Sequence, residues 1–144
     1  PIRICQELLG SDPIVLFAFL KMYEKNNIDL WGSASIGDSD SRISSQISFG
    51  FDNFYQCNLE VWGSKGLLKA DRIFTLPEDL QPIIKIQGTD GTVYPKLPVA
   101  NQFALILKFF YQAIFDDKIK KDQYSSNEKH ARLIDGIKEK ATEI

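Results

Sequence analysis

The amino-acid sequence predicts an α+β fold, with an open, predominantly antiparallel sheet and helices on one face and at the ends. Two observations predict this class: strand-length segments separated by glycine-containing turns, and helical spacing of apolar residues near both ends of the chain. Strands grouped in one run, with the helices apart from them, favour α+β over a parallel doubly wound fold. The 144 residues, 44% of them hydrophobic, suffice for one domain spanning residues 1–144.

The first two elements are expected to be a short helix and a central strand. Apolar residues at positions 2, 5, 8 and 9 repeat at helical spacing, and Gly10 and Pro13 end the helix. Residues 14–20 form an unbroken apolar run that contains aromatic and β-branched side chains. Such a run is typical of a strand covered on both faces, so we expect it near the centre of the sheet.

Hairpins are expected in the middle of the chain, because strand-length segments flank turn-forming clusters at 37–41, 63–66 and 88–91. Apolar and polar side chains alternate along the arms, as in half-buried strands. The strands expected here are residues 31–36, 42–51, 55–62, 67–70, 83–87 and 92–97. Together they predict a meandering antiparallel sheet.

Two helices are expected in the last third of the chain. An apolar stripe at helical spacing runs from Phe103 to Ile114, and Asn101 is placed to cap its start. A closing helix is expected to begin at Ser125, whose spacing to Glu128 matches a capping box. The charged residues 116–122 are expected to form a solvated connector between the two helices.

Composition and charge exclude several classes of partner. The 17 Lys and Arg residues against 19 Asp and Glu give a net charge of -2, so no long-range positive field attracts nucleic acid or anionic lipid. No apolar run approaches the roughly 20 residues of a membrane span. Cys5 and Cys57 have no neighbouring Cys or His at zinc-ligand spacing, which excludes structural zinc. A disulfide between them stays possible, but two buried thiols in a reducing cytoplasm are the better expectation.

Signals for familiar catalytic sites are weak. His130 is the only histidine and has no nucleophile or second ligand near it in sequence, so we expect an ordinary helix-surface residue. The string Trp62-Gly-Ser-Lys-Gly66 matches neither a nucleophile elbow nor a phosphate loop, and a hairpin turn explains it better. Asp38, Asp40 and Asp52 cluster around the first hairpin, where turn chemistry explains them better than a glycosidase pair.

One predicted strand face is unusual because it carries uncharged polar residues in place of the alternating Lys and Glu of a solvent-facing sheet. A wet interface with a partner subunit or a hydroxyl-rich ligand fits this face as well as bulk water does. The residues are Ser33, Ser35, Ser44, Gln46, Ser48, Gln56, Asn58 and Glu60. The chain also begins with Pro and enters helical periodicity at once, so we expect a piece of a longer protein.

Several motifs, in their order and spacing, resemble a known family. They are Gly50-Phe-Asp-Asn53, Tyr55, Leu59-Glu-Val-Trp-Gly-Ser-Lys-Gly-Leu-Leu68, Ala70-Asp-Arg-Ile-Phe-Thr75 and Asn101-Gln-Phe103. With the opening Pro1-Ile-Arg-Ile, they resemble the C-terminal domain of the Gfo/Idh/MocA oxidoreductases. The string Asp29-Leu-Trp-Gly-Ser33 and the pair Asp71-Arg72 resemble most the branch that acts on nucleotide-linked sugars.

The resemblance implies a two-domain NAD(P)-dependent oxidoreductase, whose N-terminal Rossmann domain holds NAD or NADP. This chain contains neither the G-x-G-x-x-G fingerprint nor the Glu-Lys-Pro string of the family, so we expect no cofactor site and no catalytic residue in it. The Asp and the His or Tyr of the family's second active-site motif would lie upstream of Pro1. The part left to this chain is to form the substrate wall and, as often in the family, an oligomer contact through the open sheet face.

Four residues are candidate substrate contacts by their position in that resemblance: Asp52, Tyr55 and Gln102, with Arg72 as an anion partner if the ligand carries phosphate. Each also has a structural explanation. Asp52 fits a turn, Tyr55 a core residue, Gln102 a first-turn helix residue and Arg72 a surface ion pair.

Two hypotheses of function follow. The first is the substrate-side and oligomerisation domain of an NAD(P)-dependent oxidoreductase that acts on a sugar or a nucleotide-linked sugar. The second is a non-catalytic sheet module that binds a partner protein or a carbohydrate. The sequence leaves both open.

Overall fold

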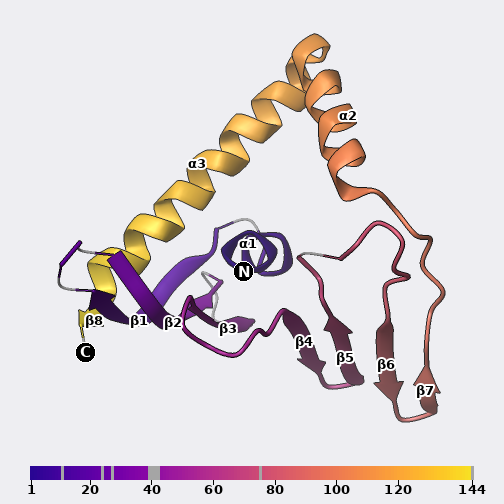
Figure 1. Cartoon of the computed structure of the whole chain (residues 1–144), viewed down its shortest axis with the longest axis horizontal. Helices are drawn as coiled ribbons and strands as arrows, with labels where there is room; N and C mark the ends of the chain where they lie inside the picture. Colours follow the sequence, from indigo (N-terminus) through magenta and orange to yellow (C-terminus); the bar gives the residue numbers. More distant parts are fainter. Residues whose placement is uncertain (11, 24, 27, 39–42, 75, 144) are drawn as a thin grey trace. The chain divides into compact units, whose positions relative to one another are not determined.

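The computed structural model describes residues 1–143 except 11, 24, 27, 39–42 and 75 (Figure 1). The chain divides into two compact units. Unit 1 comprises Pro1–Asn53 and Asp117–Ile144, and unit 2 comprises Phe54–Asp116.

Unit 1 is built on a four-stranded sheet, sheet A, with the strand order β3-β2-β1-β8. The strands are β1 (Ile14–Tyr23), β2 (Ile28–Gly37), β3 (Ser44–Gly50) and β8 (Ala141–Glu143). β1, β2 and β3 pair antiparallel, while β8 pairs parallel to β1. The expected hairpin of β2 and β3 is confirmed, and most of its turn lies outside the described residues.

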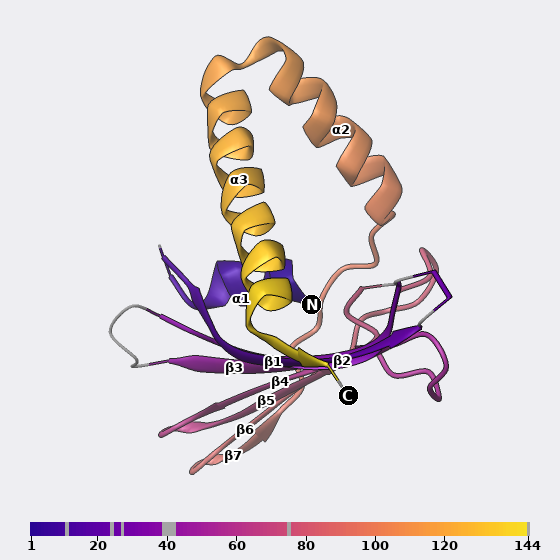
Figure 2. The same ribbon diagram turned by 90° about the vertical axis from the view of Figure 1, so that its left-hand side faces the viewer.

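The helices of unit 1, α1 (Ile2–Leu8) and α3 (Asp117–Lys140), lie on one face of sheet A (Figure 2). α1 ends as expected, since Gly10 takes the left-handed backbone conformation, with φ of 96°. The core of unit 1 lies between these helices and the sheet. Its buried members are Cys5, Leu9, Val15, Ala18, Leu20, Ala34, Ile36, Ile47, Leu133 and Ile137.

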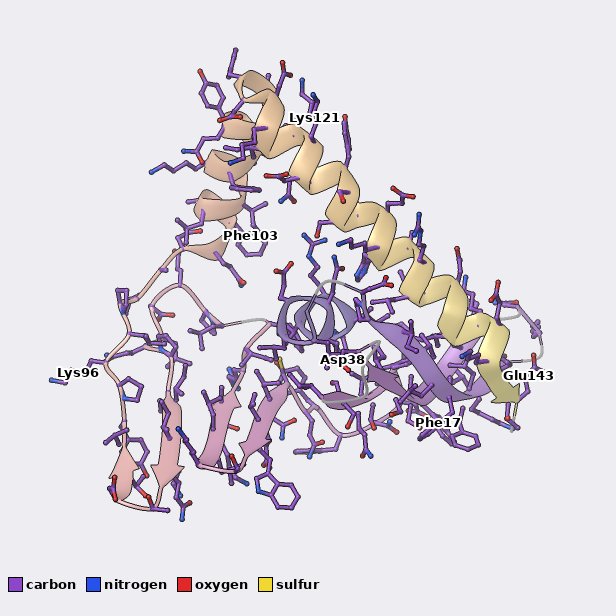
Figure 3. The ribbon with its side chains drawn as sticks, turned by 180° about the vertical axis from the view of Figure 1, so that it is seen from behind. Phe17, Asp38, Lys96, Phe103, Lys121 and Glu143 are labelled. Atoms are coloured by element: carbon purple, nitrogen blue, oxygen red, sulfur yellow. The ribbon has the colours of Figure 1, made fainter. Side chains whose placement is uncertain are left out.

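The central strand β1 is covered on one face only, so the prediction of burial on both faces is wrong for this chain. A β-bulge between Val15 and Phe17 resets the alternation, and Ala18 and Leu20 then face the core. Phe17 and Phe19 are 49% and 39% exposed. Figure 3 shows Phe17 on the side of the sheet away from α3. The unbroken apolar run therefore supplies a core face and an open apolar face.

Five of the predicted polar residues lie on the face of sheet A opposite its core, although Ser35 is itself buried, with 5% of its surface exposed. Because directly paired residues share a face, the register forms two rows across the sheet. These rows are Phe17–Ser35–Gln46 and Phe19–Ser33–Ser48, and Ser44 continues the polar side along β3. The other three predicted members do not join them, because Asn58 and Glu60 lie in a second sheet and Gln56 precedes it. The expected single polar face is thus divided between two units.

Unit 2 contains a second antiparallel sheet, sheet B, with the order β4-β5-β6-β7. Its strands are β4 (Asn58–Gly63), β5 (Gly66–Asp71), β6 (Ile84–Gly88) and β7 (Gly91–Val93). The two expected hairpins at 63–66 and 88–91 are confirmed, although β7 is shorter than predicted. The meander is therefore two sheets rather than the one that the alternation pattern suggests.

α2 (Gln102–Phe115) begins where the sequence predicts. The Asn101 side-chain oxygen accepts a hydrogen bond from the Ala104 backbone N–H at 2.9 Å, which is the expected N-cap. None of the residues of α2 is buried, and within the described residues the helix makes no substantial packing contact with a strand. Its apolar stripe, with Phe103 71% exposed, is therefore open in this chain.

α3 corrects two predictions, because it begins at Asp117 rather than at Ser125 and absorbs the expected connector 116–122 from its second residue onward. Residues 116–122 contain no Gly or Pro, and lysine is a good helix former. Asp117 in the first turn is favoured by the helix dipole and pairs with Lys120 at 3.0 Å. The capping-box spacing of Ser125 and Glu128 is incidental, since both residues lie inside the helix.

Both cysteines are free thiols, Cys5 buried and Cys57 half-buried. The Cys5 Sγ lies 3.0 Å from the Ser45 Oγ. The expectation of a buried thiol is confirmed for Cys5 and is wrong for Cys57, which is only half-buried. Across the described residues, no helix has the length and apolar character needed to cross a membrane.

Candidate functional site

The candidate site is a shallow hollow in unit 2, where the segment that leads into β4 meets the end of β5. The hollow has a volume of about 420 Å³. Strand pairing brings its two sides together, since Asn58 at the start of β4 is paired with Asp71 at the end of β5. Its lining residues are Phe54, Tyr55, Gln56, Cys57, Asn58, Asp71 and Arg72.

Two backbone contacts hold the corner after β5 against the segment before β4. The Ile73 N–H donates to the Cys57 carbonyl oxygen at 3.2 Å, and the Phe74 N–H donates to the Cys57 Sγ at 3.3 Å. Both donors follow directly on Arg72 in the chain. The Arg72 backbone is therefore fixed on both sides, by β5 before it and by Cys57 after it.

Arg72 has a left-handed backbone conformation, with φ of 53°, the only positive φ of a non-glycine residue among those described. This conformation is unfavourable for an L-residue other than Gly, Asn or Asp, by about 1–2 kcal/mol. Strained backbone of this kind persists only where the surrounding structure holds it in place, and it gathers at functional sites. Arg72 therefore combines a strained backbone with a position in the lining of the hollow.

The side chains of the hollow suit a ligand with a planar ring and an anionic group. Phe54 and Tyr55 are 96% and 57% exposed, so their rings are open to contact. The Arg72 guanidinium presents a fork of N–H donors that matches phosphate or carboxylate oxygens. Asn58 adds an amide that both donates and accepts hydrogen bonds.

The four sequence-predicted contacts separate in the structure. Tyr55 and Arg72 line the same hollow. Gln102 lies in the first turn of α2 and donates to the Leu76 carbonyl oxygen at 3.3 Å, outside the hollow. Asp52 belongs to unit 1 and is exposed. Phe54 and Asp71 were not predicted as contacts, whereas Asn58 was predicted only as part of the polar strand face that fits a partner subunit or a hydroxyl-rich ligand. Pairing about the 63–66 turn places Asn58 opposite Asp71.

His130, the only histidine, lies at the contact of α1 and α3 rather than on a free helix surface. Its Nδ1 atom is buried and has no hydrogen-bond partner among the described residues. Burial lowers the pKa of His130 below its ordinary value of 6.5, and the positive charge of Arg3 lowers it further. The neutral imidazole is therefore the form compatible with this contact.

We expect the stability of unit 1 to fall as the pH drops below about 6.5, the ordinary pKa that His130 has in the unfolded chain. The unfolded chain then binds a proton that the folded chain resists, so the proton favours unfolding. Urea unfolding of the wild type and of His130→Gln between pH 8 and pH 5.5 measures the effect. The variant is expected to lose part of the pH dependence, and identical slopes would contradict the assignment.

Comparison with known proteins gives consistent similarities. No protein-family model matches the chain. The dTDP-3,4-didehydro-2,6-dideoxy-alpha-D-glucose 3-reductase of Streptomyces violaceoruber is 33% identical over 114 residues, which cover 79% of this chain and 33% of that protein. The enzyme of the same name from Actinomadura kijaniata is 28% identical over 144 residues, which cover 100% of this chain and 43% of that protein.

The same similarity holds in three dimensions. A crystal structure of a mutant of KijD10, a 3-ketoreductase from Actinomadura kijaniata, in complex with TDP-benzene and NADP matches with a TM-score of 0.92 at 28% identity. The match covers 100% of this chain and 46% of that one, so the chain spans less than half the length of these relatives. The α+β prediction is confirmed. The chain thus resembles, over its whole length, the C-terminal part of Gfo/Idh/MocA oxidoreductases of the nucleotide-sugar branch.

Proposed function

We propose that the chain is the substrate-side domain of an NADP-dependent oxidoreductase that acts on a nucleotide-linked sugar. The observation that carries the proposal is the match along the entire chain to a 3-ketoreductase crystallised with TDP-benzene and NADP. The hollow of unit 2 supports it, because exposed aromatic rings beside Arg72 suit a ligand that joins a planar base to a diphosphate.

The dinucleotide itself does not fit the residues of this chain. A Rossmann site needs a glycine-rich turn between a parallel strand and a helix, whose N-terminus holds the pyrophosphate. The sequence has no G-x-G-x-x-G, and in the described residues only the short β8 pairs parallel, to β1. We therefore propose that a Rossmann domain outside this chain holds NADP and that no hydride-transfer step uses a group of this chain.

The role proposed for this chain is to position the sugar. A hydride acceptor has to lie about 3–3.5 Å from the donor carbon, so a rigid wall that fixes the nucleotide fixes the reacting carbon as well. Arg72, held between β5 and Cys57, is a fixed anchor of this kind. Tyr55 and Asn58 line the same hollow and complete the anchor.

The proposal is tested by two titrations of the 144-residue chain, one with TDP and one with NADPH. We expect saturable binding of TDP with chemical-shift changes at Tyr55 and Arg72, and no binding of NADPH. Tight binding of NADPH would contradict the division of roles. Saturable binding of a partner protein or a free sugar in place of TDP would favour the non-catalytic module.

We also propose that the open face of sheet A is the contact between copies of the protein. The face places Phe17 and Phe19, whose rings meet edge-on at 6.0 Å, beside the polar rows of β2 and β3. The exposed aromatic rings support the proposal, because aromatic residues are enriched in protein–protein interfaces, and the polar rows lack the alternating charges of a solvated sheet.

Replacement of Phe19 by Asp is expected to shift the protein to a smaller oligomer, because two charges would face each other or lie buried without a partner. Sedimentation velocity at several concentrations measures the change. Tyr124→Asp on α3 is the control, since Tyr124 is 68% exposed and is not on sheet A. A wild-type protein that sediments as a monomer at every concentration would contradict the proposed contact.

A further inference from the structure

The corner that places Arg72 in the hollow of unit 2 departs from the register of its own sheet. Asn58 pairs with Asp71 across β4 and β5. If this register continued, Cys57 would pair with Arg72. The Cys57 carbonyl oxygen accepts instead from the Ile73 N–H, at 3.2 Å. Arg72 is therefore an extra residue on the β5 side, as in a β-bulge.

A bulge with one residue in the left-handed conformation favours glycine at that residue, because glycine has no Cβ to collide with the following carbonyl oxygen. In this chain the position holds Arg72, with φ of 53°. Bulges redirect a side chain, and they are frequent next to active sites. Here the redirected side chain is one that lines the hollow.

Two hydrogen bonds hold the bulge in this form, and Cys57 accepts both of them. The bond from the Ile73 N–H goes to the backbone oxygen, which any residue at position 57 would supply. The bond from the Phe74 N–H goes to the Sγ atom at 3.3 Å, so it requires a side chain with an acceptor. The side chain of residue 57 therefore contributes to the backbone conformation at residue 72.

The balance between strain and hydrogen bonding at this corner is close. A left-handed arginine is unfavourable by about as much as one hydrogen bond between neutral groups is favourable. Loss of the contact with the Cys57 Sγ therefore allows Arg72 to return to a negative φ, which redirects its side chain. A ligand of the guanidinium then has to select a minor conformer, and its apparent affinity falls with the population of that conformer.

We propose that Cys57 is a positioning residue for ligand binding, an assignment that rests on the function proposed for the hollow of unit 2. Its thiol holds Arg72 in the left-handed form that presents the guanidinium to the diphosphate. Replacement of the thiol weakens binding without a matching loss of stability, because relief of the strain at Arg72 offsets part of the lost hydrogen bond.

The test compares Cys57→Ala with the wild-type chain by thermal unfolding, by the Kd for TDP and by NMR. We expect roughly 3–10-fold weaker binding of TDP, equivalent to the loss of one neutral hydrogen bond, with little change in melting temperature. A positive φ brings the amide and Hα protons of a residue close together and gives a strong NOE between them. This NOE of Arg72 is expected to weaken in free Cys57→Ala and to return on saturation with TDP.

Two further variants separate the thiol from the fold. Cys57→Ser keeps an acceptor on a shorter side chain, so its Kd is expected to lie between those of the wild type and Cys57→Ala. Cys5→Ala is the matched control, because it removes the other thiol, which is buried in unit 1 and lies 3.0 Å from the Ser45 Oγ. It is expected to lower the melting temperature and to leave the Kd for TDP unchanged.

The role of Cys57 can fail separately from the function proposed for the hollow. No saturable binding of TDP by the wild type would contradict that function, and the role of Cys57 with it. Binding by the wild type, with either the Kd or the Arg72 NOE unchanged in Cys57→Ala, would overturn the role of Cys57 alone. Equal losses of affinity in Cys57→Ala and Cys5→Ala would also overturn it, because lower stability would then explain both.

Discussion

The substitution Gly66→Ala is expected to break the pairing of β5 with β6 and to unfold sheet B. A Cβ atom at this position would lie 2.4 Å from the Gln87 carbonyl oxygen and 3.3 Å from the Gly88 Cα. Both neighbours are backbone atoms of the paired strand, so no side-chain rotation relieves the clash. Overpacking typically costs about 1–3 kcal/mol, and we expect the upper end of that range or more.

Gly63→Ala is the matched control for this prediction, because Gly63 pairs with Gly66 across the same turn. A Cβ at Gly63 would meet only the Gly66 carbonyl oxygen, at 3.9 Å, which is an ordinary contact. Hydrogen exchange of the β5 and β6 amides, with the fluorescence of Trp62 as a second probe, measures the loss. Equal protection in the two variants would show that β6 is not paired as described.

The hairpins are the part of the fold that the sequence predicts best, because a short turn sets the register of both arms. Once Gly63 and Gly66 are paired, counting outward places Asn58 opposite Asp71 without further information. The same counting brings the segment before β4 close to Arg72, so part of the candidate hollow is implicit in the sequence. Local turn chemistry thus determines a contact between residues that are 13 positions apart.

The assignment of strands to sheets was not predictable from the same pattern. Alternating side chains show that Ile47 and Val61 each lie in a strand with one apolar face, and they do not show that the two strands belong to different sheets. β8 was missed because Ala141–Glu143 follows α3 directly, with no glycine or proline to signal the change. Its pairing with β1 depends on a contact between distant parts of the chain.

The start of α3 was missed because a local signal competed with a longer-range one. Ser125 and Glu128 have the spacing of a capping box, but Ser126 instead accepts a hydrogen bond from Gln6 in the middle of the helix. The left-handed backbone of Arg72 is likewise invisible in sequence, since arginine has no preference for positive φ. It arises from the contacts of the two following residues with Cys57.

The substitution Arg72→Gly is expected to separate the effect of Arg72 on the stability of unit 2 from its effect on ligand binding. Glycine adopts a φ of 53° without the steric penalty of an L-residue, so the stability of unit 2 is expected to stay unchanged or to rise. The same change removes the guanidinium that we propose as the partner of the diphosphate. Loss of a charge-assisted hydrogen bond of about 1.5–3 kcal/mol corresponds to roughly 10–150-fold weaker binding.

The measurement pairs thermal unfolding with the Kd for TDP and, in the longer protein proposed above, with kcat and KM for the nucleotide-linked sugar. Arg72→Lys is expected to fall between the wild type and Arg72→Gly, because it keeps the charge but loses the planar fork of donors. Arg132→Ala is the control, since Arg132 pairs with Glu128 on the exposed side of α3 in unit 1. A lower melting temperature with an unchanged Kd in Arg72→Gly would contradict the proposal. The Arg72 side chain would then stabilise the fold without binding the ligand, and the left-handed backbone would not be evidence of a binding role.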